Sequence, residues 1–217
     1  MITAVLFDFD GTLVHTAPGI LAGFTKVLAA EGIVPREPVD ERVIGPPLMA
    51  TLRRLSGLEQ GAALEKLAAA FRATYDADGV LQAEPYPGLV ETLATLGKAG
   101  RRSFVVTNKR NVPTRLIADR LGITAHVGGL YSLDSLSPPA PRKSAVVRHI
   151  LGEYMLDPGA VVLVGDSAED AEAAAENGVR FIAATYGYGN PATFTGAAAV
   201  GTISALADLP ALLARLD

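Results

Sequence analysis

The spacing of apolar and polar residues changes twice along the chain. An apolar run at residues 2–7 predicts a buried strand over residues 2–9. Between residues 16 and 80 the apolar side chains recur at helical spacing, and no strand pattern occurs. Helices are expected from Pro18 to Glu31, from Leu48 to Leu55 and from Ala62 to Tyr75, with residues 33–47 as a loop.

After residue 86 strand and helix patterns alternate. Strands are expected at residues 102–107, 126–131, 160–165 and 179–185, and helices at residues 89–98, 112–121, 143–155, 168–177 and 204–215. Such alternation forms right-handed crossover units and a mainly parallel sheet. We therefore predict an α/β fold with a Rossmann-like parallel sheet flanked by helices. Residues 1–15 and 85–217 would build it, with a small α-helical domain inserted at residues 16–84.

Two carboxylates follow the first predicted strand. Asp8 and Asp10 are separated by one residue, and extended backbone would place both side chains on the same face. Neighbouring carboxylates repel one another, so the pair requires a cation or a shared proton. Gly11 allows the backbone to turn sharply after the pair. The alternative interpretation is a strand that ends in a solvated Asp-Gly turn.

Three further segments carry polar side chains at predicted strand or helix ends. Thr107-Asn108 follows a strand and suits a phosphate oxygen, although it could also cap the next helix. Lys143 begins a helix and, taken alone, could be a solvated surface charge. Asp166 follows a buried strand and Asp170 comes one helical turn later, so both could instead cap a helix. Open parallel sheets keep their sites at the carboxyl ends of the strands, so we expect these segments to lie beside the first carboxylate pair.

Composition narrows the class of protein. The 217 residues include 49% hydrophobic and 19% charged residues, which is typical of an ordered globular protein. A net charge of −4 argues against nucleic acid or an anionic membrane as the main partner, and the lack of cysteine excludes thiolate metal sites. No basic segment precedes the first apolar run and no apolar stretch is long enough to span a bilayer, so a cytoplasmic protein is expected.

Taken in chain order, these segments resemble the motifs of the haloacid dehalogenase superfamily of aspartate-nucleophile phosphohydrolases. Asp8-Phe9-Asp10-Gly11-Thr12 is similar to the first motif, Thr107 to the second, Lys143 to the third, and Gly165-Asp166 with Asp170 to the fourth. The helical insert resembles the small α-helical cap of that superfamily.

Three segments look like the phosphoglycolate phosphatase branch of the superfamily: Thr107-Asn108-Lys109, Thr185-Tyr186-Gly187-Tyr188-Gly189 and Ile44-Gly45-Pro46-Pro47-Leu48. The last of these also resembles related nucleotidases. One departure concerns the third motif, where that branch usually carries Lys-Pro and this chain has Pro141-Arg142-Lys143-Ser144. We choose Lys143 for this motif, with Arg142 as the alternative.

Together with the residue chemistry, the resemblance implies a mechanism. Asp8 would be the nucleophile that forms an aspartyl-phosphate, and Asp10 the general acid and base. Mg²⁺ suits a site of oxygen ligands, and its expected ligands are Asp8, the backbone carbonyl of Asp10, Asp166 and Asp170. Thr107, Asn108 and Lys143 would hold the phosphoryl oxygens. The expected substrate-binding positions are Asn108, Gly11 and Thr12, and Gly45 and Pro46 in the cap.

The leading hypothesis is a Mg²⁺-dependent phosphatase for a small phosphorylated metabolite, similar to phosphoglycolate phosphatase and either monomeric or homodimeric. A 5′-nucleotidase or a sugar phosphatase would keep the chemistry and change the substrate. An isomerase of the β-phosphoglucomutase kind is disfavoured because no arginine pattern in the cap suggests a second phosphate site. A dehalogenase or a phosphonatase is disfavoured because an acid and base at Asp10 suits phosphate esters. An inactive binding protein is disfavoured because every motif keeps its reactive side chain.

Overall fold

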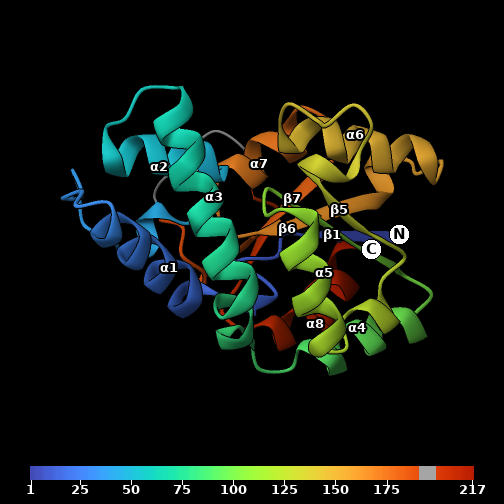
Figure 1. Cartoon of the computed structure of the whole chain (residues 1–217). Coiled ribbons are helices and arrows are strands. Elements are labelled where there is room, and N and C mark those ends of the chain that lie inside the picture. The colour runs from blue at the N-terminus through green and yellow to red at the C-terminus, as the bar shows by residue number, and fades with distance from the viewer. Residues whose placement is uncertain (191–198) are drawn as a thin grey trace. The chain divides into compact units, whose positions relative to one another are not determined.

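The computed structural model describes residues 1–190 and 199–217 (Figure 1). The chain divides into two compact units, of which the first comprises Met1–His15 and Pro85–Asp217 and the second Thr16–Glu84. The second unit has the same bounds as the helical insert expected from the sequence. We call the first unit the core and the second the helical unit.

A parallel sheet forms the centre of the core. Among the described residues it has six strands in the order β5-β4-β1-β6-β7-β8, and each pair of neighbours runs parallel. The strands are β1 (Ala4–Phe7), β4 (Arg102–Thr107), β5 (Leu130–Ser132), β6 (Val161–Gly165), β7 (Arg180–Ala184) and β8 (Gly201–Ile203). This arrangement confirms the predicted fold class.

Helices cover both faces of this sheet. In Figure 1, α6 (Lys143–Glu153) and α7 (Ala168–Ala175) lie on one face, and α4 (Leu89–Lys98), α5 (Asn111–Arg120) and α8 (Leu209–Leu216) lie on the other. Because both faces are covered, the central strands are continuous apolar runs such as Val161–Val164, in which every residue is buried. The α6 and α7 side buries a cluster that includes Leu6, Phe104, Val147 and Leu163.

The register of the sheet brings three strand ends together. Phe7, the last residue of β1, is paired with Val105 of β4 on one side and Val164 of β6 on the other. The chain moves from β1 to β4 on one side and later returns to β6 on the opposite side, so the direction of the strand order changes at β1. Such a switch point is where open α/β sheets place their sites.

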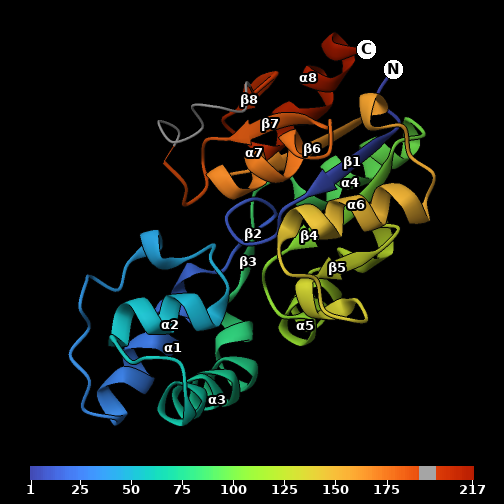
Figure 2. The same ribbon diagram turned by 90° about the horizontal axis from the view of Figure 1, so that it is seen from above.

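The helical unit contains the helices α1 (Ala17–Ala30), α2 (Leu48–Ser56) and α3 (Ala62–Ala77), which are labelled in Figure 2. Helices α1 and α3 pack through stacked rings of Phe24 and Phe71, whose centroids are 4.5 Å apart. Gly23 permits this close approach, because a Cβ atom there would lie 2.9 Å from the ring of Phe71. Gly57 ends α2 in the left-handed conformation that glycine favours.

The structure differs from the sequence expectation at the margins of the sheet. The strand expected at residues 126–131 lies at Leu130–Ser132, and a 3-10 helix occupies Thr124–His126. The last helix begins at Leu209 rather than at residue 204, and β8 precedes it. A two-stranded sheet of β2 (Val14–His15) and β3 (Glu84–Pro85) was also not expected. These strands are two or three residues long, and pairing with a neighbour defines them more than any apolar pattern of their own.

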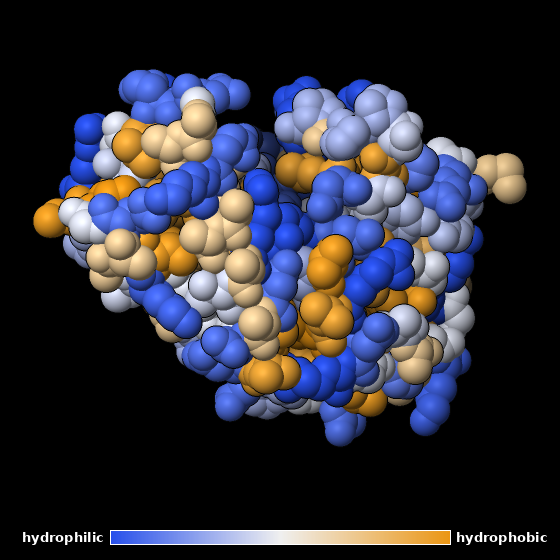
Figure 3. Space-filling view, viewed as in Figure 1, coloured by the Kyte–Doolittle hydropathy of each residue, from blue (hydrophilic) through white to orange (hydrophobic). Residues whose placement is uncertain are grey.

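Polar side chains dominate the face of the molecule shown in Figure 3, and apolar side chains form small patches. Val112 and Leu116, one turn apart on α5, are exposed apolar residues. Isolated apolar groups of this size are normal on folded proteins. Within the described parts of the chain, no helix combines the length and the apolar character needed to cross a membrane.

Candidate active site

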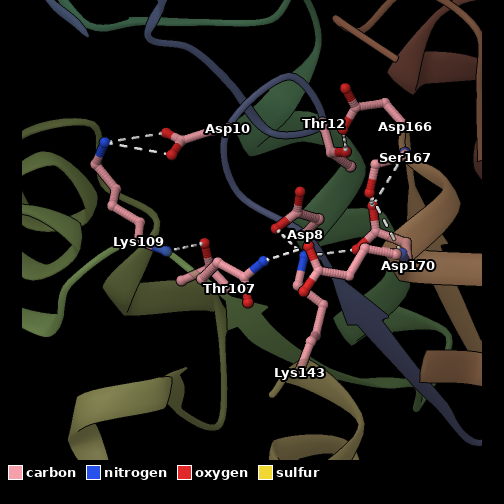
Figure 4. Close-up of polar contacts among 11 residues, drawn as sticks. Asp8, Asp10, Thr12, Thr107, Lys109, Lys143, Asp166, Ser167 and Asp170 are labelled. Atoms are coloured by element: carbon pink, nitrogen blue, oxygen red, sulfur yellow. Dashed lines mark hydrogen bonds and ion pairs between the residues drawn. The ribbon is translucent and has the colours of Figure 1, made fainter. Parts of the chain in front are cut away.

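Three carboxylates meet at the carboxyl ends of β1 and β6 (Figure 4). Asp8 directly follows β1, Asp166 directly follows β6, and Asp170 lies in the first turn of α7. Each offers an oxygen atom within 4.8 Å of those of the other two, and all three residues are buried. We call Asp8, Asp166 and Asp170 the acidic cluster. Buried like charges at this separation repel one another, so the cluster is suited to a cation.

Lys143 supplies a positive charge to the acidic cluster. Its Nζ atom lies 2.6 Å from Oδ1 of Asp170 and 2.9 Å from Oδ1 of Asp8, and its side chain is 3% exposed. Burial opposes the charged form, but the carboxylates of Asp170 and Asp8 raise the pKa of Lys143 above its ordinary value. The neighbouring Arg142 instead pairs with Glu176 on the surface, at 2.6 Å. Lys143, and not Arg142, therefore contacts the acidic cluster.

One lysine does not balance three carboxylates, and the pKa values of the cluster reflect this. Burial and the charge of Asp170 raise the pKa of Asp8 well above its ordinary value, although Lys143 acts in the opposite direction. Burial and Asp170 also raise the pKa of Asp166 to about 6, against the hydrogen bonds from Thr12 and Tyr188 that favour its charged form. A divalent cation among these oxygens would offset the excess negative charge.

Two loops fix the orientation of Asp166. The Thr12 hydroxyl donates to Oδ1 at 2.9 Å, and the backbone N–H groups of Tyr188 and Gly189 donate to Oδ2 at 2.8 and 3.2 Å. Gly11 is required here, because its φ is +85° and a Cβ atom would lie 2.5 Å from Oδ2 of Asp166. The carboxylate is therefore held by donors on both oxygens.

Asp170 has a structural role as well as its place in the acidic cluster. Its Oδ2 atom accepts hydrogen bonds from the backbone N–H of Ser167 at 3.1 Å and from the hydroxyl of Ser167 at 2.6 Å. Together with the bond from Asp170 N–H back to Ser167 Oγ, these form a capping box that begins α7. Oδ1 remains directed to Lys143. The helix cap and the functional interpretation of Asp170 are thus compatible.

The turn after β4 places Thr107 beside these strand ends. Thr107 is buried, and its hydroxyl oxygen accepts a hydrogen bond from the backbone N–H of Lys109 at 3.1 Å. The side-chain amide of Asn108 donates to Glu169 of α7 at 2.7 Å. The turn is therefore fixed at both ends, which suits residues that must present donors in one geometry.

Asp10 is separate from the acidic cluster. Figure 4 shows its carboxylate directed away from Asp8 and toward Lys109, whose Nζ atom lies 3.1 Å from Oδ1 and 3.3 Å from Oδ2. The expectation that Asp8 and Asp10 share one face of a strand does not apply, because β1 ends at Phe7 and the chain then turns at Gly11. Asp10 thus has a lysine as its cationic partner and leaves three carboxylates in the cluster.

The remaining predicted substrate-binding positions fall into two groups. In the core, the backbone N–H groups of Gly11 and Thr12 donate within their own turn, to the carbonyl oxygens of Val14 and Phe9. Gly45 and Pro46 are exposed in the loop of the helical unit that precedes α2. For both groups, contact with a substrate stays a prediction.

Several contacts in the site were not anticipated from the sequence. The ion pair of Lys109 with Asp10 is one of them, because no sequence pattern indicates a partner for this lysine. Ser167 follows the motif aspartate, and its pattern with Asp170 is readable as a capping box. Tyr188 acts through its backbone N–H group, which no side-chain pattern reveals.

Comparisons with known proteins show which family this chain resembles. The sequence model of the haloacid dehalogenase-like hydrolases matches residues 5–184. A phosphoglycolate phosphatase of Rhodospirillum rubrum is 32% identical over 207 residues, which cover 91% of this chain and 86% of that protein. In Pseudomonas aeruginosa, an N-acetylmuramic acid 6-phosphate phosphatase is 33% identical, with coverage of 87% and 84%, and a 5′-nucleotidase is 30% identical, with coverage of 86% and 84%.

Two further similarities concern a longer protein and a solved structure. The tyrosine-protein kinase PtkA of Mycobacterium tuberculosis is 34% identical over 186 residues, but the match covers only 62% of its length and 85% of this chain. The haloacid dehalogenase-like family protein SP0104 of Streptococcus pneumoniae has a TM-score of 0.86 at 26% identity, and the match covers 100% of this chain and 99% of that one. With its motifs gathered at the strand ends of the core, this chain belongs to the haloacid dehalogenase-like hydrolase family.

Proposed function

We propose that this protein is a Mg²⁺-dependent phosphatase that hydrolyses a small organic phosphomonoester through an aspartyl-phosphate. The observation that carries the proposal is the buried carboxylate of Asp8 at the end of β1, 2.9 Å from the ammonium of Lys143 and beside two further carboxylates. A carboxylate in this position can attack phosphorus, and the ammonium of Lys143 can stabilise the phosphoryl group as it is transferred.

In the first half of the reaction, an oxygen of Asp8 attacks phosphorus as the bond to the leaving oxygen breaks. Asp10 donates a proton to that oxygen, so the leaving group departs as an alcohol and Asp10 becomes a carboxylate. Lys143 and the turn at Thr107-Asn108 hold the phosphoryl oxygens during transfer.

In the second half, water attacks the phosphorus of the aspartyl-phosphate. Asp10 takes the proton that the water loses, and the bond between phosphorus and Asp8 breaks. Phosphate leaves, Asp8 is again a carboxylate, and Asp10 is again an acid. The cycle therefore needs no proton donor beyond Asp10 and water.

The acidic cluster fits a magnesium ion. Its three oxygen donors lie close enough to share one cation, and its charge exceeds that of Lys143. Asp8, Asp166, Asp170 and the backbone carbonyl of Asp10 would hold the ion, which prefers oxygen ligands. When bound, Mg²⁺ would lower the charge repulsion between Asp8 and a phosphate dianion and polarise the phosphoryl group.

Relatives support a small phosphomonoester as substrate and leave its leaving group open. The names of the relatives include a phosphoglycolate phosphatase, an N-acetylmuramic acid 6-phosphate phosphatase and a 5′-nucleotidase. We propose phosphoglycolate-like substrates first, because the segments around Asn108, Gly45 and Tyr188 resemble that branch, and sugar phosphates or nucleotides second. The helical unit, with Gly45 and Pro46 in an exposed loop, would select the leaving group.

The proposal is tested by turnover of p-nitrophenyl phosphate with and without Mg²⁺, followed by a panel of 2-phosphoglycolate, sugar phosphates and nucleoside monophosphates. We expect turnover with Mg²⁺ and none with EDTA. A chimera that carries residues 16–84 of a related phosphatase should change the order of preference and keep the metal requirement. Full turnover in EDTA would contradict the metal assignment, and an unchanged order of preference in an active chimera would contradict the role of the helical unit.

A further inference from the structure

The ion pair between Asp10 and Lys109 lies apart from the acidic cluster (Figure 4). The ammonium lies within 3.3 Å of both carboxylate oxygens, and the side chains are only 5% exposed for Lys109 and 13% for Asp10. Exposed ion pairs contribute little, but a shielded pair with contacts to both oxygens restricts the orientation of the carboxylate. Lys109 therefore helps to hold the carboxyl group of Asp10 in this orientation.

The position of Lys109 is itself fixed by the site. Its backbone N–H donates to the hydroxyl of Thr107 at 3.1 Å, so the turn that carries Thr107 also carries the lysine. The partner carboxylate comes from the loop after β1, which is 99 residues away in the sequence. Lys109 thus joins two of the loops at the strand ends through one contact.

The direction of the Asp10 carboxylate suits its proposed chemistry. In an in-line displacement, the nucleophile and the leaving oxygen lie on opposite sides of phosphorus. A group that protonates the leaving oxygen must therefore lie away from Asp8, the nucleophile. Figure 4 shows the carboxylate of Asp10 directed away from Asp8 and held there by Lys109.

We propose that Lys109 is a positioning residue that holds the carboxyl group of Asp10 on the leaving-group side of the phosphoryl group. The inference rests on the proposed phosphatase function. Asp10 gives its proton to the leaving oxygen and becomes a carboxylate, which the ammonium of Lys109 stabilises until water returns a proton. Lys109 keeps its own proton throughout and touches neither phosphorus nor the metal site.

The experiment compares two substrates in one enzyme preparation. Ethyl phosphate has a poor leaving group that needs a proton, whereas p-nitrophenyl phosphate has a good one that does not. Lys109→Met should lower kcat/KM for ethyl phosphate by about 30-fold, a part of the 10²–10⁴ that general acid catalysis provides, and for p-nitrophenyl phosphate by no more than about 3-fold. Because both values come from the same preparation, a partly unfolded variant would change them equally and leave their ratio intact.

Three further variants sharpen the result. Lys109→Arg keeps the charge and should recover most of the activity toward ethyl phosphate. In an Asp10→Asn background, Lys109→Met should not change the ratio between the two substrates, because no proton remains to be positioned. Lys98→Met, an exposed lysine on α4, is the matched control and should leave both values near those of the wild type.

The outcomes separate this inference from the function on which it rests. Equal losses with both substrates, or no loss, would overturn the role of Lys109 and leave the phosphatase intact. A rise in KM for 2-phosphoglycolate, which carries a carboxylate, without a loss for ethyl phosphate would also overturn it, because Lys109 would then contact the substrate directly. A wild-type protein with no activity on either substrate would overturn the phosphatase proposal and the role of Lys109 with it.

Discussion

The acidic cluster and Asp10, which lie at the same edge of the sheet, differ in how lysines contact them. In the acidic cluster, Lys143 faces Asp8 and Asp170, with Asp166 beside them, so negative charge exceeds positive charge. At Asp10, the ammonium of Lys109 lies within 3.3 Å of both carboxylate oxygens. A buried excess of negative charge is tolerable only with a further cation or a retained proton, whereas an ammonium beside a carboxylate stabilises its charged form. This difference supports our proposal that the acidic cluster carries the metal and phosphoryl chemistry and that Asp10 carries the proton transfer.

The largest effect should come from the nucleophile in the acidic cluster. Asp8→Asn keeps the shape of the side chain and removes the attacking carboxylate, so kcat should fall by on the order of 10³-fold or more. Phosphatase assays with Mg²⁺ measure the loss. The matched control is Glu172→Gln, the same change at an exposed position of α7. A variant that keeps more than about a tenth of the wild-type activity would rule out this role for Asp8.

Lys143 should be the next most damaging position, because it is the only lysine within hydrogen-bond distance of the described acidic cluster. Lys143→Ala removes the charge that faces the phosphoryl group and should lower kcat by about 10²-fold. Arg142→Ala removes only a surface pair with Glu176 and should be mild. Greater damage from Arg142→Ala would show that the third motif is displaced by one residue.

The charge excess predicts a link between magnesium and stability. At about 100 times its dissociation constant, Mg²⁺ should stabilise the wild type by roughly 2.7 kcal/mol. Thermal unfolding with and without the ion measures this shift. A melting temperature that is indifferent to Mg²⁺ would contradict the assignment of the metal to the acidic cluster.

The raised pKa of Asp166 adds a pH dependence to this link. Its folded-state pKa of about 6 exceeds that of an unfolded aspartate, so the folded state binds the proton more tightly. In the metal-free protein, the protonated Asp166 therefore stabilises the fold by on the order of 3 kcal/mol. This contribution is fully present below about pH 4 and is lost as the pH rises through about 6. Mg²⁺ should stabilise more at pH 7 than at pH 5. Asp166→Asn should remove most of the difference between the stabilisation by Mg²⁺ at pH 7 and at pH 5. If the wild type and the variant show the same difference, Asp166 is not the source of this pH dependence.

The central elements of the fold were predictable from the sequence, and its edges were not. Helix 89–98 and strand 102–107 have the observed bounds, because their apolar periods are long and their ends are marked by Gly88 and Gly100. β8 spans three residues beside a single neighbour, β7, so its existence depends on a pairing that local sequence does not encode. The resemblance to the haloacid dehalogenase superfamily is confirmed by the match over residues 5–184.

The candidate site also has parts that could be predicted from the sequence and parts that could not. The gathering of Asp8, Asp166 and Asp170 with Lys143 could be predicted, because parallel strands end at one edge and each residue follows such an end or begins a helix. The partner of Asp10 could not, because Lys109 is 99 residues away and its side chain is long enough to reach several positions. Pairs of this kind become visible only when the loops are placed in space.

The most direct test of the account is to identify the residue that carries the phosphoryl group during turnover. Borohydride reduces an aspartyl-phosphate to homoserine, and tandem mass spectrometry locates the change in a peptide. We expect homoserine at position 8 when the protein turns over substrate with Mg²⁺, and unchanged aspartate at position 10. Homoserine at another aspartate, or none during sustained turnover, would contradict the assignment of the nucleophile to the acidic cluster.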